Sequence, residues 1–400
     1  MVPNPALGVL FHWLGGLASG SFYVPYRWVR RWSWETYWLA GGIFSWIIAP
    51  WVFGYIMTKD LWAVLSEASG STLFWAFFFG LLWGVGGLTF GLTMRYLGLS
   101  LGMAMVLGLC AAFGTLMPPI FRGEFMNQVV GTTSGRVILF GIFVCLLGIA
   151  AAGLAGISKE RAMSPGQQKA VIKEFALKKG VAVATLSGVM SACFAYGLAA
   201  GDPIKVITLK HGTPTLWQGL PVLVVVLIGG FTTNFIWCLI LNIRNKTGYQ
   251  YFTSKSREPF KGDETIIETA VDAPGREVVE HMPARQDTHA VGVLEKAASR
   301  ETAEPVPMLA NYLLCALAGT TWYFQFFFYT MGETQMGRFK FSSWTLHMAS
   351  IIIFSTLWGL GLKEWKGAGA PAMRLLALAL VLLVGSTVIV GYGNYLGLAH

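Results

Sequence analysis

Two histidines stand inside long apolar stretches of the sequence. His347 lies in SSWTLHMASI (342–351), and His12 lies in FHWLGGLASG (11–20). Because the unperturbed pKa of histidine is about 6.5, an imidazole can bind and release a proton near neutral pH. If such a stretch crosses a membrane, burying an ionisable side chain costs several kcal/mol, and the residue becomes a functional candidate. We expect both histidines to carry the proton of a coupled process. The alternative for each is a single hydrogen bond to a neighbouring helix.

A second group of residues combines aromatic rings with a side-chain amide. Trp322, Gln325 and Tyr329 fall at i, i+3 and i+7, so they share one face of a helix. Aromatic faces stack on the apolar side of a small ligand, and an amide both donates and accepts hydrogen bonds. This combination suits a ligand with several hydroxyl groups, such as a sugar. Three residues of other apolar stretches join the candidate binding set: Trp83, Asn234 and Trp344. Ordinary helix packing is the alternative for the aromatic residues.

Charged side chains at the ends of apolar stretches form a third group. Glu35 follows the basic cluster at residues 27–31 and is a candidate for a gating ion pair with it. Arg95 ends another apolar stretch and is the second gate candidate. The alternative for Arg95 is a side chain that extends along the helix to the membrane surface.

The stretches that carry these residues are long enough to cross a membrane. The chain has 400 residues, of which 54% are hydrophobic and only 12% are charged, whereas a soluble domain is about 25% charged. The apolar blocks are about 20 residues long, which is the helix length that crosses roughly 30 Å of hydrocarbon. We therefore predict an all-α integral membrane protein with ten transmembrane helices. Their predicted bounds are 6–26, 36–57, 72–94, 99–121, 136–157, 179–199, 217–243, 308–331, 340–362 and 373–397.

The same residue types argue against several other classes of protein. All five cysteines fall inside predicted helices without a CxxC pair, so neither a zinc site nor a disulfide framework is indicated. The sequence has no GxGxxG and no GxxxxGK[ST] motif, so ATP-driven transport by this chain alone is not supported. The predicted helices carry no paired carboxylates that would serve an enzyme. We expect no enzymatic activity, no metal ion and no cofactor, with the proton as the coupling ion.

The distribution of lysine and arginine predicts the orientation of the chain. The loops after predicted helices 1, 3, 5 and 9 carry thirteen basic residues, against seven in the loops after helices 2, 4, 6 and 8. Cytoplasmic loops are enriched in lysine and arginine. We therefore expect both termini in the periplasm. The polar segment 244–306 is predicted to be a long flexible cytoplasmic loop.

Residues of the first half of the chain recur in the second half. The matched pairs are Gly8/Gly180, Gly16/Gly188, Gly80/Gly319, Trp83/Trp322 and Gly98/Gly337. Each repeat would hold five helices, and because five is odd the second copy must enter the membrane from the opposite side. Inverted repeats of this kind are typical of secondary transporters, with the substrate site between the halves. We predict a first repeat at 1–157, a cytoplasmic linker at 158–178 and a second repeat at 179–400.

Several longer motifs of the chain are similar to those of a known family. They are FHWLGGLASGSFYVPY (11–26), WSWETYWLAGGIFSWIIAPW (32–51), GLTMRYLGLSLGM (91–103), WYFQFFFY (322–329), SSWTLHM (342–348) and LKEWKG (362–367). These motifs resemble the bacterial L-rhamnose–proton symporter family, a ten-helix branch of the drug/metabolite transporter superfamily. The resemblance implies uptake of L-rhamnose or a related deoxyhexose with a proton, by alternating access in the inner membrane. Expected partners are the sugar and membrane lipid, without nucleic acid, and the protein would be a monomer or homodimer.

Two positions depart from the pattern of that family. Gly87 and Ala199 stand where the resemblance leads us to expect asparagine, which leaves the identity of the sugar open. The main alternative is a related carrier of another sugar or small metabolite, running inward or outward. An ion channel is a remote alternative, because the filter-like sequence at 390–393 has no pore helices around it. An intramembrane protease built on Ser19 is equally remote, because hydrolysis also needs an oxyanion site.

Overall fold

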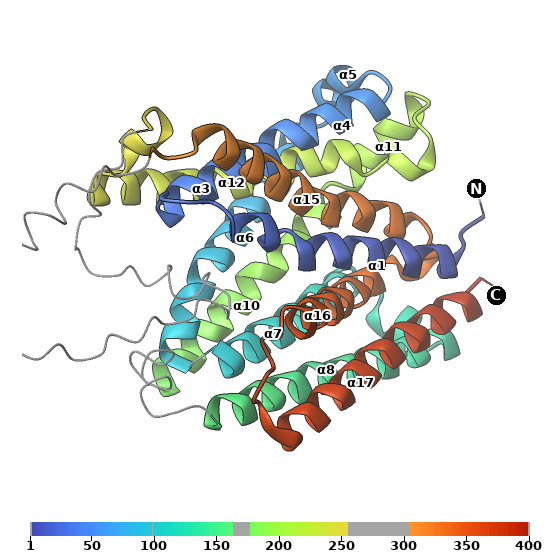
Figure 1. Cartoon of the computed structure of the whole chain (residues 1–400). Helices are drawn as coiled ribbons and strands as arrows, with labels where there is room; N and C mark the ends of the chain where they lie inside the picture. The colour runs from blue at the N-terminus through green and yellow to red at the C-terminus, as the bar shows by residue number, and fades with distance from the viewer. Residues whose placement is uncertain (1, 98, 163–176, 255–304, 399–400) are drawn as a thin grey trace, which may run out of the picture.

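The computed structural model describes residues 2–97, 99–162, 177–254 and 305–398, and the statements below refer to them (Figure 1). The described chain is built of helices and has no strand, as predicted. In chain order the helices are α1 (Pro5–Ser21), α2 (Tyr23–Tyr26), α3 (Trp34–Gly42), η1 (Ile43–Ile48), α4 (Ala49–Met57), α5 (Leu61–Glu67), α6 (Gly70–Leu97), α7 (Leu99–Phe121), η2 (Phe125–Val130), α8 (Thr133–Arg161), α10 (Leu177–Ala200), α11 (Asp202–Lys210), η3 (Thr215–Trp217), α12 (Leu220–Asn245), η4 (Gly248–Tyr251), α15 (Met308–Thr334), η5 (Gly337–Ser342), α16 (Ser343–Gly361) and α17 (Gly369–Leu396).

The long helices match the predicted membrane spans. Nine stretches of the described chain are long and apolar enough to cross a membrane. The remaining predicted span, 308–331, coincides with α15, whose 27 residues extend about 40 Å at a rise of roughly 1.5 Å per residue. Helix α15 contains threonine, tyrosine and amide side chains among its apolar residues. It also carries Trp322, Gln325 and Tyr329 of the candidate binding set.

Several predicted boundaries move in the structure. Helix α8 continues to Arg161, so the linker begins later than residue 158, and residues 163–176 lie outside the described chain. Helix α12 runs to Asn245 and η4 follows, so the predicted loop 244–306 is helical where it begins. Residues 255–304 of that loop lie outside the described chain. The described ends of the loop meet, because the Val306 amide donates to the Ser254 carbonyl at 2.8 Å.

The second span contains a π-helical turn, η1, that the sequence analysis did not predict. Pro50 has no amide hydrogen, so the Trp46 carbonyl lacks its usual donor four residues later. The Ala49 amide instead donates to the Phe44 carbonyl, five residues back. Such bulges recur at functional sites because they turn side chains out of the regular helical register. Here the bulge sets the direction of Trp46.

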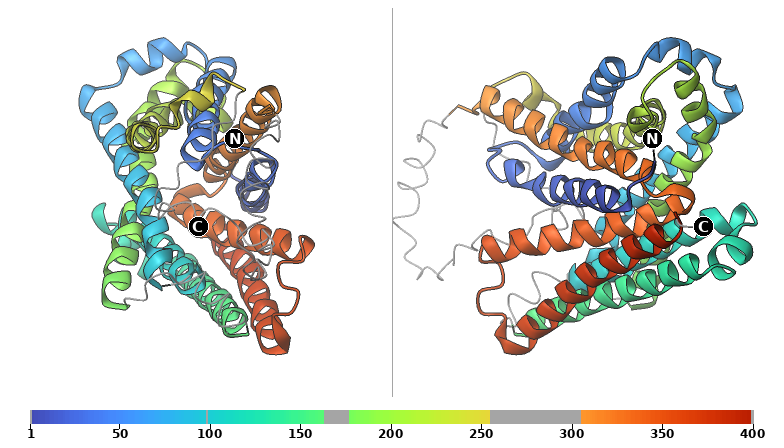
Figure 2. Two further views of the ribbon diagram at one scale, coloured as in Figure 1. Left: turned by 60° about the vertical axis from the view of Figure 1, so that its left-hand side comes forward. Right: turned by 90° about the vertical axis from the view of Figure 1, so that its right-hand side faces the viewer.

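The long helices pack in matched pairs. Helix α1 lies against α15 and α16, while α10 lies against α6 and α7. Helix α6 packs on α12, and α15 packs on α3 and η1. Helices α8 and α17 lie along each other at one side of the bundle (Figure 2). Exchanging the first five spans for the second five reproduces this list of neighbours, which is consistent with the predicted repeat.

The matched glycines occupy corresponding places in these contacts. A Cβ at Gly80 would collide with the Val226 backbone in α12, and one at Gly319 with the Gly41 backbone in α3. Both glycines therefore bring two helices together at the backbone, as small residues do in membranes. The partner of Gly337, Gly98, lies outside the described chain.

Helix α1 begins and α17 ends at the same end of the bundle (Figure 1). A chain whose ends share one side of a membrane crosses it an even number of times. This arrangement fits ten crossings. The side chains at that end are those of the loops predicted to face the periplasm.

Candidate functional site

The two histidines come together in the interior of the bundle. His12 in α1 and His347 in α16 are both fully buried. The ring of Tyr329 in α15 stands edge-on to each, with centroid distances of 5.3 Å to His12 and 5.3 Å to His347. None of the four imidazole nitrogens has a hydrogen-bond partner among the described residues. Buried polar atoms are nearly always paired in folded proteins, so four unpaired imidazole nitrogens at one place are an unusual feature of this interior.

Two glycines allow the histidines to approach α15. A Cβ built at Gly332 would lie 2.8 Å from Cε1 and Nε2 of His12. A Cβ built at Gly15 would lie 2.8 Å from the Gln325 carbonyl oxygen and 3.4 Å from Nδ1 of His347. Helix α1 therefore contacts α15 almost backbone to backbone, and any larger residue at these places would push the imidazoles away.

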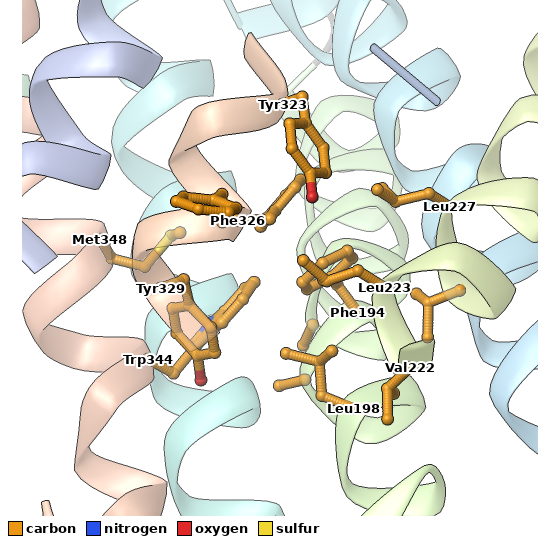
Figure 3. Packing of buried hydrophobic residues seen from close by; sticks show 14 of the residues in the cluster. Phe194, Leu198, Val222, Leu223, Leu227, Tyr323, Phe326, Tyr329, Trp344 and Met348 are labelled. Atoms are coloured by element: carbon orange, nitrogen blue, oxygen red, sulfur yellow. The ribbon is translucent and has the colours of Figure 1, made fainter. Parts of the chain in front are cut away.

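Trp344 closes one side of the histidine pair. Its indole nitrogen donates to the Cys110 carbonyl in α7 at 3.0 Å, which fixes the ring. The ring lies 6.1 Å from the His347 imidazole and 5.8 Å from Tyr329. Apolar side chains of α10 and α12 lie opposite Tyr329 and Trp344 in the same cluster (Figure 3). Trp344 of the candidate binding set therefore lies against His347 and Tyr329, one helical turn before His347.

The predicted aromatic residues of the two halves also meet. Trp83 in α6 stacks on Trp322 in α15 with centroids 5.6 Å apart and the planes at 29°. Trp46 stands edge-on to Trp322 at 5.5 Å. Gln325, one turn further along α15, is buried and its amide nitrogen has no partner among the described residues. These residues surround a centre that offers flat apolar faces and one unpaired amide.

Beside Trp322 lies a small cavity that the sequence analysis did not anticipate. Its volume is about 10 Å³, and its walls include Tyr26, Trp38, Ser45 and Trp46. Tyr26 fits there because its hydroxyl rests on Gly41. The sequence WETYWLAGGIFSW (34–46) could have indicated this site, because aromatic residues stand on both sides of two adjacent glycines.

Asn234 of the predicted binding set lies behind this wall. Its side-chain oxygen accepts a hydrogen bond from the Trp38 indole at 3.1 Å, and its nitrogen donates to the Gly230 carbonyl at 2.9 Å. Both ends of the amide are thus engaged. Asn234 holds Trp38 in place instead of presenting an unpaired amide.

The gate candidates lie at the opposite end of the bundle from the termini. The Glu35 carboxylate accepts hydrogen bonds from Thr247 at 2.7 Å and from Asn245 at 3.1 Å, at the end of α12. Arg27 of the basic cluster pairs with Glu364 at 3.6 Å. Glu364 is half-buried, and burial raises its pKa while Arg27 and Lys159 oppose that rise. The side chain of Arg95 lies outside the described part of the chain.

A group of charged residues at the end near the termini escaped the sequence analysis. Lys205 in α11 is buried and lies 2.6 Å from Glu333 and 3.1 Å from Asp202. A cavity of about 160 Å³ adjoins them. Glu333 stood beside the end of a predicted helix, and Asp202 and Lys205 stood in a predicted loop, where a charge usually indicates a solvated surface. The spacing Asp202–Lys205, three residues apart, was the available signal.

The described chain contains no cluster of three or more histidine, cysteine, aspartate or glutamate residues that could hold a metal ion. Its geometry instead brings protonatable rings and stacked tryptophans from two sets of helices to one buried centre. An apolar helical bundle with such a centre defines the class of secondary transporters.

Comparison with known proteins gives the family. Residues 1–250 and 290–396 match the family described as L-rhamnose-proton symport protein (RhaT). The chain is 35% identical to the L-rhamnose-proton symporter of Cronobacter sakazakii over 388 residues, which cover 97% of each chain. It is 34% identical to the symporter of Yersinia pestis over 388 residues, again 97% of each chain. The chain belongs to the L-rhamnose-proton symporter family. Residues 251–289, within the long loop, lie outside the family match.

Proposed function

We propose that this chain imports L-rhamnose, or a closely related deoxyhexose, together with a proton across the bacterial inner membrane. The observation that carries the proposal is the pair of buried imidazoles, His12 and His347, which both contact Tyr329. A lone buried histidine is commonly hydrogen-bonded, whereas these four nitrogens have no partner among the described residues. The names of the relatives, L-rhamnose-proton symporters, agree with proton handling at such a site.

The sugar would bind beside the histidines. Trp83 and Trp322 offer ring faces for the apolar side of a deoxyhexose, and Gln325 offers an amide for its hydroxyl groups. Tyr329 and Trp344 would line the side that faces His347. Asn234 would act indirectly, by holding Trp38. Since the cavity beside Trp322 measures only about 10 Å³, these walls must separate before a sugar can enter.

Alternating access would come from two inverted repeats, residues 1–157 and 179–400. The equivalent neighbours of the two sets of helices support this assignment. So do the equivalent contacts of Gly80 and Gly319. Two similar halves can adopt two packings of similar free energy, each open to one side of the membrane. The site between them would then face the periplasm and the cytoplasm in turn.

The termini would lie in the periplasm, and the loop 244–306 in the cytoplasm. The lysine and arginine distribution supports this orientation. Glu35, Arg95 and the Arg27–Glu364 pair would then belong to the inner gate. The working unit would be a monomer or homodimer in lipid.

A carrier for a different sugar or metabolite, or an exporter, is the second candidate. It is favoured by one observation: a Cβ at Gly87 would meet no atom within 4 Å. Space at a position where the family resemblance leads us to expect asparagine would allow a changed ligand. Substrate competition decides between the two candidates.

The test uses weakly buffered, de-energised cells that express the chain. L-rhamnose is added, then other sugars in separate runs, while the external pH is recorded. A sugar-specific alkaline shift is the expected result for symport. A shift with another sugar but not with L-rhamnose would identify that sugar as the substrate. An absence of any shift would refute proton-coupled import.

A further inference from the structure

The charged cavity near the termini includes Glu333, which stands one helical turn after Tyr329 in α15. Its walls include Asp202 and Lys205 of α11, Glu333 of α15 and Lys340 of η5. The volume of about 160 Å³ is enough for several waters, since one water needs roughly 10–15 Å³ of such space. A polar cavity of this size can bring solvent protons to the buried end of α15.

The two carboxylates of the cavity are held differently. Asp202 contacts three cations: Arg122 at 2.7 Å, Lys205 at 3.1 Å and Lys340 at 3.1 Å. Among the described residues, Glu333 has one cationic contact, with Lys205 at 2.6 Å. Protonating Asp202 would thus weaken three ion pairs, whereas protonating Glu333 would weaken one. Of the two carboxylates, Glu333 is held by fewer cations among the described residues.

Glu333 also adjoins the histidine site along α15. Its neighbour Gly332 lies against the His12 ring, because a Cβ there would be 2.8 Å from Nε2. Tyr329, one turn before Glu333, touches both imidazoles. Residues four apart on a helix have Cβ atoms roughly 5–6 Å apart. Glu333 therefore follows directly after the glycine that contacts His12 and stands one helical turn from the tyrosine that contacts both imidazoles.

We propose that Glu333 is the outer proton-loading group of the transporter. This inference rests on the proposed function, because it takes the cavity to face the periplasm. A proton from cavity water binds the Glu333 carboxylate and weakens its ion pair with Lys205. The proton then passes to a nitrogen of His12, which becomes an imidazolium. Glu333 returns to its carboxylate form and pairs again with Lys205.

The charged and titratable groups around Glu333 come from several elements. They are Asp202 and Lys205 of α11, Lys340 of η5, Arg122 after α7, His12 of α1 and Tyr329 of α15. Asp202 provides the matched control, because it lines the same cavity and shares Lys205. In our assignment it anchors the three cations and takes up no proton during transport.

The experiment reconstitutes the full chain into liposomes and compares wild type, Glu333→Gln, Glu333→Asp and Asp202→Asn. Sugar counterflow at equal pH on both sides needs no net proton movement. Uptake driven by an inward proton gradient, and the sugar-induced change of a trapped pH dye, both need it. Glu333→Gln should keep counterflow and lose both proton-dependent signals to the level of empty liposomes. Glu333→Asp and Asp202→Asn should keep all three signals.

Several outcomes would overturn the inference. Gradient-driven uptake by Glu333→Gln at the wild-type level would do so directly. Equal loss of coupling in Asp202→Asn would show that Glu333 acts only as one member of a structural ion-pair network. Recovery of coupling by the exchanged pair Lys205→Glu/Glu333→Lys would show that only the ion pair matters.

Two controls keep the test decisive. If Glu333→Gln loses counterflow, the double variant Lys205→Met/Glu333→Gln, which leaves no unpaired buried ammonium, repeats the comparison. Counterflow without gradient-driven uptake in that variant supports the inference, and retained gradient-driven uptake or lost counterflow rejects it. Failure of wild-type protein to link sugar and proton movement would instead reject the proposed function itself.

Discussion

The ring of Tyr329 stands edge-on to the imidazole of His347, with their centroids 5.3 Å apart. The centroid of the His12 imidazole, in helix α1, is also 5.3 Å from the centroid of the Tyr329 ring. One aromatic side chain therefore contacts both buried histidines of the interior. A positive charge on one imidazole would disfavour protonation of the other, so we expect the pair to carry one proton at a time.

Replacing His347 by alanine tests the central assignment. His347→Ala should abolish the sugar-induced alkaline shift, because one imidazole of the pair that shares the proton is gone. Sugar counterflow at equal pH should persist. External pH recording and radiolabelled sugar exchange measure the two properties. His211→Ala is the matched control, since that histidine contacts Glu67 at the surface and its loss should leave the shift unchanged. Normal coupled uptake by His347→Ala would remove this residue from the mechanism.

A methyl group at residue 332 tests the close approach of α1 and α15. Gly332→Ala should place its Cβ against the His12 ring, and overpacking of this kind costs roughly 1–3 kcal/mol. We expect lower thermal stability in detergent and reduced proton-driven uptake. Gly361→Ala is the control, because a Cβ there meets no atom within 4 Å. Equal effects of the two substitutions would contradict the close contact.

The amide of Gln325 should determine sugar affinity. Gln325→Ala is expected to raise the half-saturating sugar concentration by about tenfold, since an unpaired buried partner costs roughly 1–3 kcal/mol and a factor of ten is about 1.4 kcal/mol. Initial uptake rates over a range of sugar concentrations measure this change. Tyr323→Phe serves as the control, because Tyr323 stacks on Phe53 away from the Trp83–Trp322 pair. An unchanged concentration dependence in Gln325→Ala would place the sugar elsewhere.

The pH dependence of stability should report on Glu364. Burial raises the folded-state pKa of this carboxyl above its ordinary 4.5, so the folded state binds its proton more tightly than the unfolded state does. The corresponding stabilisation is present at acid pH and is lost as the pH rises through the folded pKa. The free energy of unfolding of wild type, relative to Glu364→Gln, should therefore fall as the pH rises above about 4.5. Thermal unfolding in detergent over this range measures the difference, and a difference that does not vary with pH would oppose the assignment.

Single-cysteine labelling tests the orientation of the chain. The five native cysteines are buried, so background labelling of intact cells should be low. Cysteines introduced at Val2 and Asp60, whose side chains are exposed, should react with a membrane-impermeant thiol reagent in intact cells. A cysteine at Trp28, which is 59% exposed, should react only after permeabilisation. The reverse pattern would invert the proposed topology.

The residues of the buried centre could be predicted from the sequence because they are polar side chains within apolar stretches. His12, His347 and Gln325 are polar side chains in apolar helices, and the structure gathers them with Trp83 and Trp322. The all-helical fold followed from the lengths of the apolar blocks. Neither inference needed a knowledge of which helices are neighbours.

The features that were missed depend on neighbours or on a change of helical register. Lys205 lies within the short helix α11 and Glu333 near the end of α15, 128 residues apart in the sequence, and only the fold brings them into contact. The bulge at η1 arises from Pro50, whose presence in an apolar helix indicates a distortion without giving its form. Asn234 was correctly placed inside the bundle, but its engagement by Trp38 depends on how α3 meets α12.

The hydrogen bond between Val306 and Ser254 fastens the two ends of the long insertion side by side. Each doubling of loop length adds only about 0.6 kcal/mol to the free energy of loop closure. The stability of the helical bundle should therefore depend little on the length of the segment between those residues. A fluorescent protein whose own first and last residues are adjacent could be spliced in there. The fusion protein could then be imaged or purified through the inserted fluorescent protein, and the helices of the transporter would keep their packing.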